Sequence, residues 1–184
     1  MSLILASASP RRRELLSLIT PDFKVIPAEG EETPDKTLPP DILVQRLAAQ
    51  KAAQIAALYP HDTVIGADTL VFLGDEIMGK PADPADAKRM LTLLSANTHT
   101  VITAVAIIQN GTSKVFSEET KVEFFSLTED EITAYIATGE PMDKAGAYGI
   151  QDKGALLVKG ITGDYYNVMG LPVGRLYREL NTFL

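Results

Sequence analysis

The chain has 184 residues, 46% of them hydrophobic and 22% charged, which is typical of a soluble globular protein. With a formal net charge of −7 it lacks the basic surplus expected for nucleic-acid binding, and no apolar run is long enough for a membrane-spanning helix. The absence of cysteine excludes disulfides, zinc–thiolate sites and thiol nucleophiles, and the two histidines leave little room for a histidine metal site. We therefore expect one cytoplasmic domain over residues 1–184, with neither nucleic acid nor a membrane as a partner.

The first half of the chain predicts short strands that alternate with helices. Apolar, partly β-branched runs indicate the strands, and N-cap residues followed by proline, as in Ser9-Pro10 and Asp83-Pro84, indicate where helices begin. In the second helix, an apolar stripe that runs from Val44 to Leu58 is expected to face the core. The expected strands cover residues 3–6, 23–27 and 63–73, and the expected helices cover residues 10–19, 41–58 and about 84–96.

The second half predicts hairpins and shorter helices. Asn110-Gly111 is a strong hairpin signal between strands over 98–109 and 114–125, and Thr128 with Glu131 forms a capping box that opens a short helix. Another strand pair is expected over 155–159 and 165–169, followed by a last helix over 172–183. Helices mixed with hairpins indicate an α/β fold with a mixed, partly antiparallel sheet flanked by helices.

Three consecutive arginines, at positions 11–13, occupy the opening turn of the first expected helix. Cations are unfavourable there by about 0.3–1 kcal/mol per charge, because the helix dipole already makes that end positive. A bound anion reverses the balance, since free N–H groups and guanidinium groups would all face it. The preceding loop with Ser7 and Ser9 also suits a phosphate. The pattern leaves two interpretations open, a phosphate site and a solvated basic turn.

Asp68 interrupts an otherwise apolar strand over residues 63–73. A buried carboxylate costs several kcal/mol unless a cation or hydrogen-bond donors compensate for it. Gly66 and Ala67 beside it would let a ligand or a metal approach the backbone. We interpret Asp68 as a metal ligand or general base, and the alternative is a structural carboxylate satisfied by neighbouring N–H groups or an arginine.

Other charged and glycine-rich positions give weaker signals. Lys51 lies within the apolar stripe of its helix, where snorkelling to the surface is the simplest explanation. Lys80 lies in a loop after the hairpin, and Glu31-Glu32 resembles solvated loop charge. The two glycines of Asp143–Gln151 predict backbone that passes close to another group, although a plain turn before a strand also explains them.

Four motifs in order resemble the Maf family of nucleoside triphosphate pyrophosphatases. They are Ser7-Ala8-Ser9-Pro10-Arg11-Arg12, Gly66-Ala67-Asp68-Thr69, Gly79-Lys80-Pro81, and Asp143–Gln151 followed by Gly170-Leu171-Pro172. The resemblance covers residues 3 to about 173. It implies a Maf/ITPase-like fold with two lobes around a central cleft, and often a homodimer.

The resemblance also implies an activity and its residues. A nucleoside triphosphate would be cut to the monophosphate and pyrophosphate by metal-assisted attack of water at the α-phosphate. Arg11, Arg12, Lys51 and Lys80 would hold the triphosphate, and Asp68 would accept the proton. A divalent cation, Mg²⁺ or Mn²⁺, would bind Asp68 with Glu31 or Glu32, where many family members have Asp-Glu.

The resemblance extends to the substrate. Arg12, Thr69 and Gln151 match the positions that the family associates with substrate choice, in the combination of the branch acting on dTTP and UTP. A glutamine amide can accept from N3–H of uracil or thymine while donating to the adjacent carbonyl. Two alternatives remain, a non-catalytic nucleotide-binding regulator of septum formation and cell division, and a phosphatase that releases orthophosphate stepwise.

Overall fold

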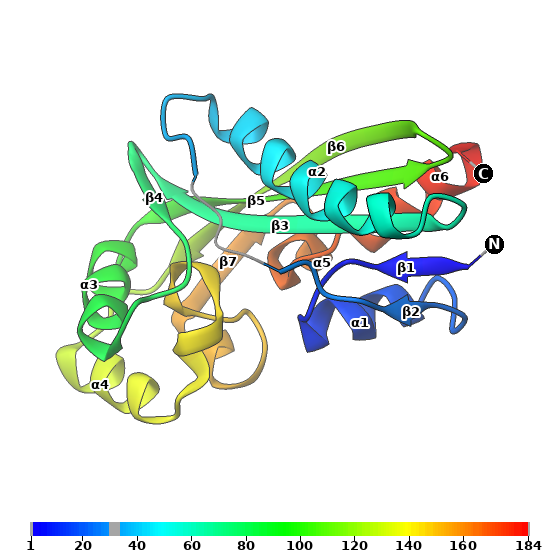
Figure 1. The fold of residues 1–184 in the computed structure, drawn as a ribbon. Coiled ribbons are helices and arrows are strands. Elements are labelled where there is room, and N and C mark those ends of the chain that lie inside the picture. The colour runs from blue at the N-terminus through cyan, green and yellow to red at the C-terminus, as the bar shows by residue number, and fades with distance from the viewer. Residues whose placement is uncertain (1, 30–33, 184) are drawn as a thin grey trace. The chain divides into compact units, whose positions relative to one another are not determined.

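The computed structural model describes residues 2–29 and 34–183, which divide into two compact units (Figure 1). Unit 1 comprises Met1–Asp68, Thr103–Glu118 and Gly170–Leu184, and unit 2 comprises Thr69–Ile102 and Glu119–Met169. Three long strands contribute residues to both units, namely β3 (Thr63–Leu73), β5 (Thr98–Gln109) and β6 (Thr112–Phe124). Unit 1 is therefore assembled from three separate stretches of sequence.

The strands of the described residues form a seven-stranded sheet in the order β2-β1-β3-β5-β6-β7, with β4 paired with β3. In unit 1, β1 (Leu3–Leu5) is parallel to both β2 (Lys24–Val25) and β3, with Leu5 opposite Ile65. In unit 2, β4 (Glu76–Met78) is antiparallel to β3, and β7 (Val158–Thr162) is antiparallel to β6. This confirms the mixed, partly antiparallel sheet.

The helices of unit 1 are α1 (Pro10–Ser17), α2 (Pro40–Leu58) and α6 (Val173–Phe183). Val44, Leu47 and Ile55 of α2 are buried, as the apolar stripe predicts, but Leu58 is 69% exposed. The expectation for Leu58 was wrong because α2 ends there, and the last turn of a helix need not lie over the core. Gln45 Nε2 donates to Ser117 Oγ at 2.8 Å, which ties α2 to β6.

Unit 2 contains α3 (Pro84–Leu94), α4 (Glu129–Ala137) and α5 (Tyr165–Met169), with short 3₁₀ segments between α4 and β7. Helix α3 contacts α4 and the 3₁₀ segments. Side chains from these elements and from β3 to β6 form a continuous apolar core. Its largest members are Met78, Met90, Leu91, Leu94, Phe124, Ile132, Tyr135, Tyr148 and Leu157.

The predicted helix starts are confirmed by their hydrogen bonds. Ser9 Oγ accepts from Arg12 N, Asp83 Oδ1 accepts from Asp86 N, and Thr128 forms the expected capping box with Glu131. Asn110 and Gly111 both have positive φ, 48° and 78°, as a tight two-residue hairpin requires. Local sequence chemistry therefore determines these boundaries.

The expected strand pair over 155–159 and 165–169 was wrong. Residues 152–157 form a 3₁₀ segment, β7 pairs with β6, and residues 165–169 are helical. Tertiary hydrogen bonds explain the helix: Asn167 Nδ2 donates to Val101 O at 3.1 Å and to Thr120 Oγ1 at 3.0 Å, and Asp164 Oδ1 accepts from Tyr166 N. These contacts override the strand propensity of the tyrosines and Val168.

Across residues 2–29 and 34–183, none of the helices combines the length and the apolar character that crossing a membrane requires.

Candidate active site

The centre of the candidate site in unit 1 is an ion pair between a strand and a helix. Lys51 Nζ on α2 lies 2.5 Å from Asp68 Oδ1 on β3. Only 19% of the lysine side chain and 11% of the aspartate side chain are exposed. The pairing compensates for the carboxylate in its apolar strand, and it explains why Lys51 lies within the apolar stripe of α2 instead of snorkelling to the surface.

Gly66 lets α2 lie directly on β3. A Cβ atom at this position would be 2.5 Å from Ala48 O and 2.6 Å from Ala52 N, both backbone atoms of α2. The expectation that Gly66 admits a ligand was therefore wrong, because the backbone of α2 occupies that space. The close approach brings Lys51, one residue before Ala52, to Asp68, two residues after Gly66.

Arg12 connects the first helix to two distant backbone segments of unit 1. Its Nε donates to Gly170 O at 2.8 Å, and its Nη1 donates to Ala67 O at 2.9 Å and to Ser7 Oγ at 3.4 Å. Ala67 directly precedes Asp68, so the Arg12 guanidinium is hydrogen-bonded to the backbone immediately before the acidic residue of the site. Sequence reasoning marked Arg12 but missed that backbone carbonyls would be its partners.

The two serines of the first loop organise the backbone there. Ser7 is buried, and its Oγ accepts from Ser9 N at 3.3 Å as well as from Arg12. Ser9 Oγ accepts from Arg12 N at 3.4 Å as the N-cap of α1. The structure thus brings Ser7, Ser9 and Arg12 together at the start of α1.

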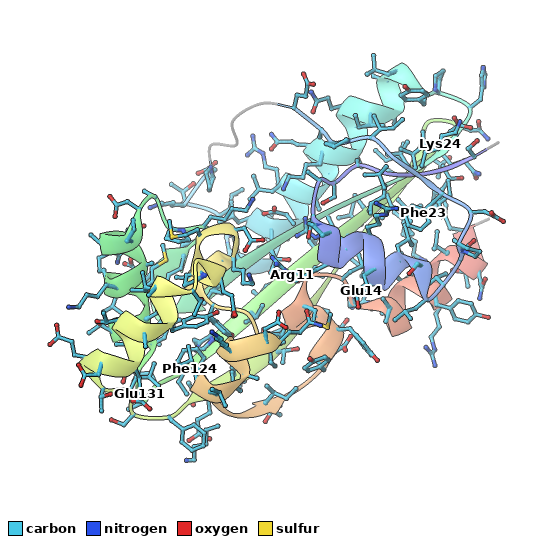
Figure 2. The ribbon with its side chains drawn as sticks, turned by 90° about the horizontal axis from the view of Figure 1, so that it is seen from below. Arg11, Glu14, Phe23, Lys24, Phe124 and Glu131 are labelled. Atoms are coloured by element: carbon cyan, nitrogen blue, oxygen red, sulfur yellow. The ribbon has the colours of Figure 1, made fainter. Side chains whose placement is uncertain are left out.

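Arg11 and Arg13, in the same turn of α1, differ in exposure. Arg13 is exposed and Arg11 is half-buried. Figure 2 shows Arg11 at the first turn of α1, with Glu14 one turn further along the helix. The first turn of α1 carries no acidic residue, so its positive end is not neutralised by its own side chains.

The candidate residues of unit 2 are Thr69, Lys80 and Gln151. Lys80 is exposed, whereas Thr69 and Gln151 are half-buried. The segments that carry Lys80 and Gln151 are joined by a backbone hydrogen bond from Gly146 N to Gly79 O at 3.0 Å. Two of the motifs in unit 2 are therefore adjacent, which their separation in sequence did not reveal.

The glycines of Asp143–Gln151 lie close to neighbouring side chains. Gly146 has φ 69°, and a Cβ there would be 2.9 Å from Val71 Cγ2. A Cβ on Gly149 would be 2.8 Å from Lys144 Cε. The expected close approach is confirmed, and the groups approached are side chains of unit 2.

A divalent cation would find carboxylate oxygens of the type it prefers at Asp68. Within residues 2–29 and 34–183, His, Asp and Glu side chains form no cluster of three that could hold a metal ion. The other two predicted ligands, Glu31 and Glu32, lie outside the described residues. The donor chemistry of Asp68 fits a hard cation, and the remainder of the set stays a prediction.

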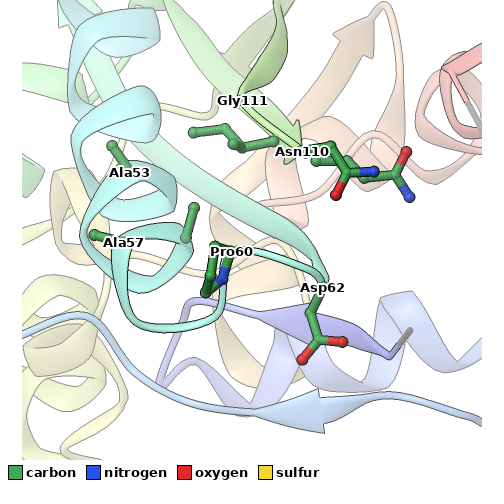
Figure 3. Close-up of a pocket in the computed structure, with 9 residues that line it drawn as sticks. Ala53, Ala57, Pro60, Asp62, Asn110 and Gly111 are labelled. Carbon is green, nitrogen blue, oxygen red and sulfur yellow. The ribbon is translucent and has the colours of Figure 1, made fainter.

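A pocket of about 310 Å³ lies elsewhere on unit 1, between α2 and the β5–β6 turn (Figure 3). Its lining includes Ala53, Ala57, Pro60, Asp62 and Asn110. The lining contains an acidic side chain and neither lysine nor arginine, so it does not suit a phosphate. None of the described candidate residues lines this pocket.

Comparison with known families and proteins gives a consistent result. The family model described as "Maf-like protein" matches residues 2–183. A dTTP/UTP pyrophosphatase of Bacillus cytotoxicus is 52% identical over 180 residues, 98% of this chain and 94% of that protein. A dTTP/UTP pyrophosphatase of a Geobacillus species is 53% identical over 178 residues, 97% of this chain and 96% of that protein.

Among solved structures, the Staphylococcus aureus Ham1 protein matches with a TM-score of 0.45 and 17% identity, over 67% of this chain and 72% of that chain.

Proposed function

The chain belongs to the Maf-like protein family, and we propose on that basis that it is a nucleoside triphosphate pyrophosphatase that hydrolyses dTTP and UTP. The products are the nucleoside monophosphate and pyrophosphate. The observation that carries the proposal is the buried Lys51–Asp68 pair beside the Arg12 guanidinium, since hydrolysis of a polyanion needs cations and a base together.

We assign phosphate binding to positively charged side chains. In unit 1 these are Arg11, Arg12 and Lys51, with the Ser7 and Ser9 hydroxyls at the start of α1. In unit 2, the exposed Lys80 contributes an ammonium group. Charged donors of this kind stabilise the negative charge that develops on the phosphate oxygens and on the leaving pyrophosphate.

Asp68 would act as the proton acceptor. A water oxygen forms the new bond to the α-phosphorus, the bond from that phosphorus to the bridging oxygen breaks, and the carboxylate takes the proton of the water. The burial of Asp68 keeps this carboxylate away from bulk solvent, and Lys51 holds one of its oxygens. Arg12, through Ala67 O, fixes the backbone from which Asp68 projects.

A divalent cation, Mg²⁺ or Mn²⁺, would be held by Asp68 with Glu31 or Glu32, and would supply further neutralisation of the phosphate charge. Lys51 and the cation would then share the same carboxylate, so metal affinity is expected to depend on Lys51.

Base selection is assigned to Arg12, Thr69 and Gln151. The Gln151 amide offers one acceptor and two donors, which match N3–H and the adjacent carbonyl of uracil or thymine. Cytosine presents an acceptor at N3 and a donor at N4, so it would be mismatched with an amide held in the orientation that suits uracil or thymine. A site with a buried polar group that loses its partner discriminates strongly.

The test is release of pyrophosphate from a panel of triphosphates with Mg²⁺ or Mn²⁺. Purified protein is expected to release pyrophosphate, with dTTP and UTP preferred over CTP and the purine nucleotides. Release of orthophosphate would replace the proposal by a stepwise phosphatase, and binding without turnover would replace it by a nucleotide-binding regulator.

Asp68→Asn tests the base. It is expected to lower kcat by about 10²–10⁴, the usual general-base contribution, while dTTP binding and the folded structure persist. Asp62→Asn is the matched control, because Asp62 Oδ1 accepts from Ser2 N and has no proposed part in catalysis. Near-normal turnover by Asp68→Asn would remove the catalytic role of Asp68.

A further inference from the structure

Unit 2 contains a buried hydrogen bond between two side chains that have no place in the proposed chemistry. His99 Nε2, on β5, lies 2.7 Å from the hydroxyl oxygen of Tyr148, and the two residues are 1% and 5% exposed. Both rings also contact the Phe124 ring edge-to-face, with centroids 5.0 and 4.7 Å away. Figure 2 labels Phe124 on β6. The three aromatic rings therefore form one rigid cluster.

Both partners of the hydrogen bond are neutral at neutral pH. Burial lowers the pKa of His99 to about 4 and raises the pKa of Tyr148. Among the described residues, His99 Nδ1 has no hydrogen-bond partner. Removing the Tyr148 hydroxyl would therefore leave the whole imidazole without a hydrogen bond in the part of the chain that the structure describes.

The backbone around Tyr148 includes left-handed conformations, two of them at residues other than glycine. Ala147 and Asp152 have positive φ, 60° and 52°, and Gly146 has φ 69°. Left-handed conformations of residues other than glycine cost on the order of 1 kcal/mol or more, and they persist only when surrounding contacts fix them. Tyr148 directly follows two of these three residues and lies three residues before Gln151.

A second tyrosine supports the same backbone. Gly149 N donates to the Tyr135 hydroxyl at 3.2 Å. The Gly146–Gly79 hydrogen bond links the segment to the loop of Lys80. The segment that leads to Gln151 is thus fixed at three points, of which the bond between His99 and Tyr148 is the one buried on both sides.

We propose that His99 and Tyr148 are positioning residues that fix the segment 146–151 so that Gln151 can recognise the pyrimidine edge. This inference rests on the proposed function. The hydrogen bond between the Tyr148 hydroxyl and His99 on β5 holds the segment in its left-handed conformations, from which it would otherwise relax. Gln151 then meets the base without having to be ordered during binding, which lowers the free-energy cost of recognition.

The experiment compares Tyr148→Phe, His99→Met and His99→Gln by pyrophosphate release from UTP and CTP. Phenylalanine keeps the ring of Tyr148 and methionine fills the space of His99, but both remove the hydrogen bond. Tyr148→Phe and His99→Met are each expected to raise the KM for UTP about three- to tenfold. Each is also expected to reduce the preference for UTP over CTP by a similar factor. The kcat for UTP is expected to change little.

His99→Gln is the conservative variant, because its amide reaches the position of Nε2 and can still bond to the Tyr148 hydroxyl. It is expected to restore most of the preference for UTP. Tyr177→Phe is the control, since Tyr177 is 52% exposed on α6 in unit 1. It is expected to leave KM and preference unchanged.

Three outcomes are distinguishable. A raised KM and lost preference in Tyr148→Phe and His99→Met, with recovery in His99→Gln, support the inference. A lower melting temperature with unchanged KM and preference overturns it, since the pair would then contribute only to stability. Absence of pyrophosphate release from the unaltered protein overturns the proposed function and this inference together.

Discussion

A carboxylate within an apolar strand costs several kcal/mol, and Lys51 Nζ at 2.5 Å is what compensates for it at Asp68. The lysine is equally dependent on the aspartate, because its side chain extends from the apolar stripe of α2. Each charge explains the position of the other. Removal of either partner is expected to leave the remaining charge poorly solvated, so a single substitution at this pair lowers the free energy of unfolding as well as turnover, although the protein still folds.

His99 makes the stability of the protein depend on pH. Its folded pKa of about 4 lies below the usual value of 6.5, because burial disfavours the charged imidazole. Below pH 6.5 the unfolded chain therefore binds a proton that the folded protein does not. The contribution of His99 to the free energy of unfolding is therefore fully present above pH 6.5. It is lost as the pH falls towards 4, by roughly 3 kcal/mol at most.

This pH dependence is measurable by urea unfolding between pH 4 and 8. The free energy of unfolding of His99→Gln is expected to change less between pH 6.5 and pH 4 than that of the unaltered protein. His61→Gln serves as the control, because His61 is exposed and its removal should not change the slope. Parallel pH profiles for the unaltered protein and His99→Gln would contradict the assignment.

At the scale of elements, the contact between α2 and β3 depends on Gly66, because glycine has no side chain to separate them. The backbone of α2 lies where a Cβ on Gly66 would be placed. Gly66→Ala is expected to destabilise the protein by about 1–3 kcal/mol, because backbone atoms must shift to admit the methyl group. It should also lower turnover, since the shift separates Lys51 from Asp68.

Gly160→Ala is the matched control for this prediction. A Cβ at Gly160, on β7, would meet nothing within 4 Å, and its φ is not in the left-handed region. Denaturant unfolding and pyrophosphate release should remain nearly unchanged for it. Equal effects of the two substitutions would show that the close packing of α2 on β3 is not the cause.

The sequence predicted elements well where local chemistry determines them. The caps at Ser9, Asp83 and Thr128 and the turn at Asn110-Gly111 each contain their own hydrogen-bond or φ requirement, and all were confirmed. Residues 165–169 were predicted as a strand because tyrosine and valine favour strands. Asn167 bonds to Val101 O and Thr120 Oγ1, partners about 50 residues or more away, and such contacts cannot be read from a local pattern.

The same distinction holds for the candidate site. Asp68, Lys51 and Arg12 were identifiable because each breaks a local rule of polarity or helix charge. Their pairing with one another and with the carbonyls of Ala67 and Gly170 depends on the fold. His99 gave no signal, because a lone histidine in apolar surroundings is an ordinary core residue. Tyr148 lies in the segment Asp143–Gln151 that the sequence singled out, but its hydrogen bond to His99 depends on the fold.

At the scale of the whole molecule, substrate binding is expected to stabilise the folded chain. With a chelator present to prevent turnover, dTTP at 100 times its dissociation constant should contribute about 2.7 kcal/mol. For a chain of this length that corresponds to a rise of roughly 5–10 °C in melting temperature. Differential scanning fluorimetry measures the rise directly.

The matched comparison is dATP at the same concentration, for which a smaller rise is expected. Arg12→Met should reduce the rise with dTTP, because it removes a guanidinium from the start of α1. Equal shifts with dTTP and dATP would contradict pyrimidine selection but would leave phosphate binding intact.

The contacts of Arg12 have a consequence for how the protein is made in a cell. Helix α1 and β3 leave the ribosome early, but the carbonyl of Gly170 is synthesised about 100 residues after Ala67. A nascent chain therefore carries the acidic and basic groups long before the arginine can reach all of its partners. A chain that ended between Asp68 and Gly170 would contain Asp68, Lys51 and Arg12 and yet lack the hydrogen bond from Arg12 to Gly170 O.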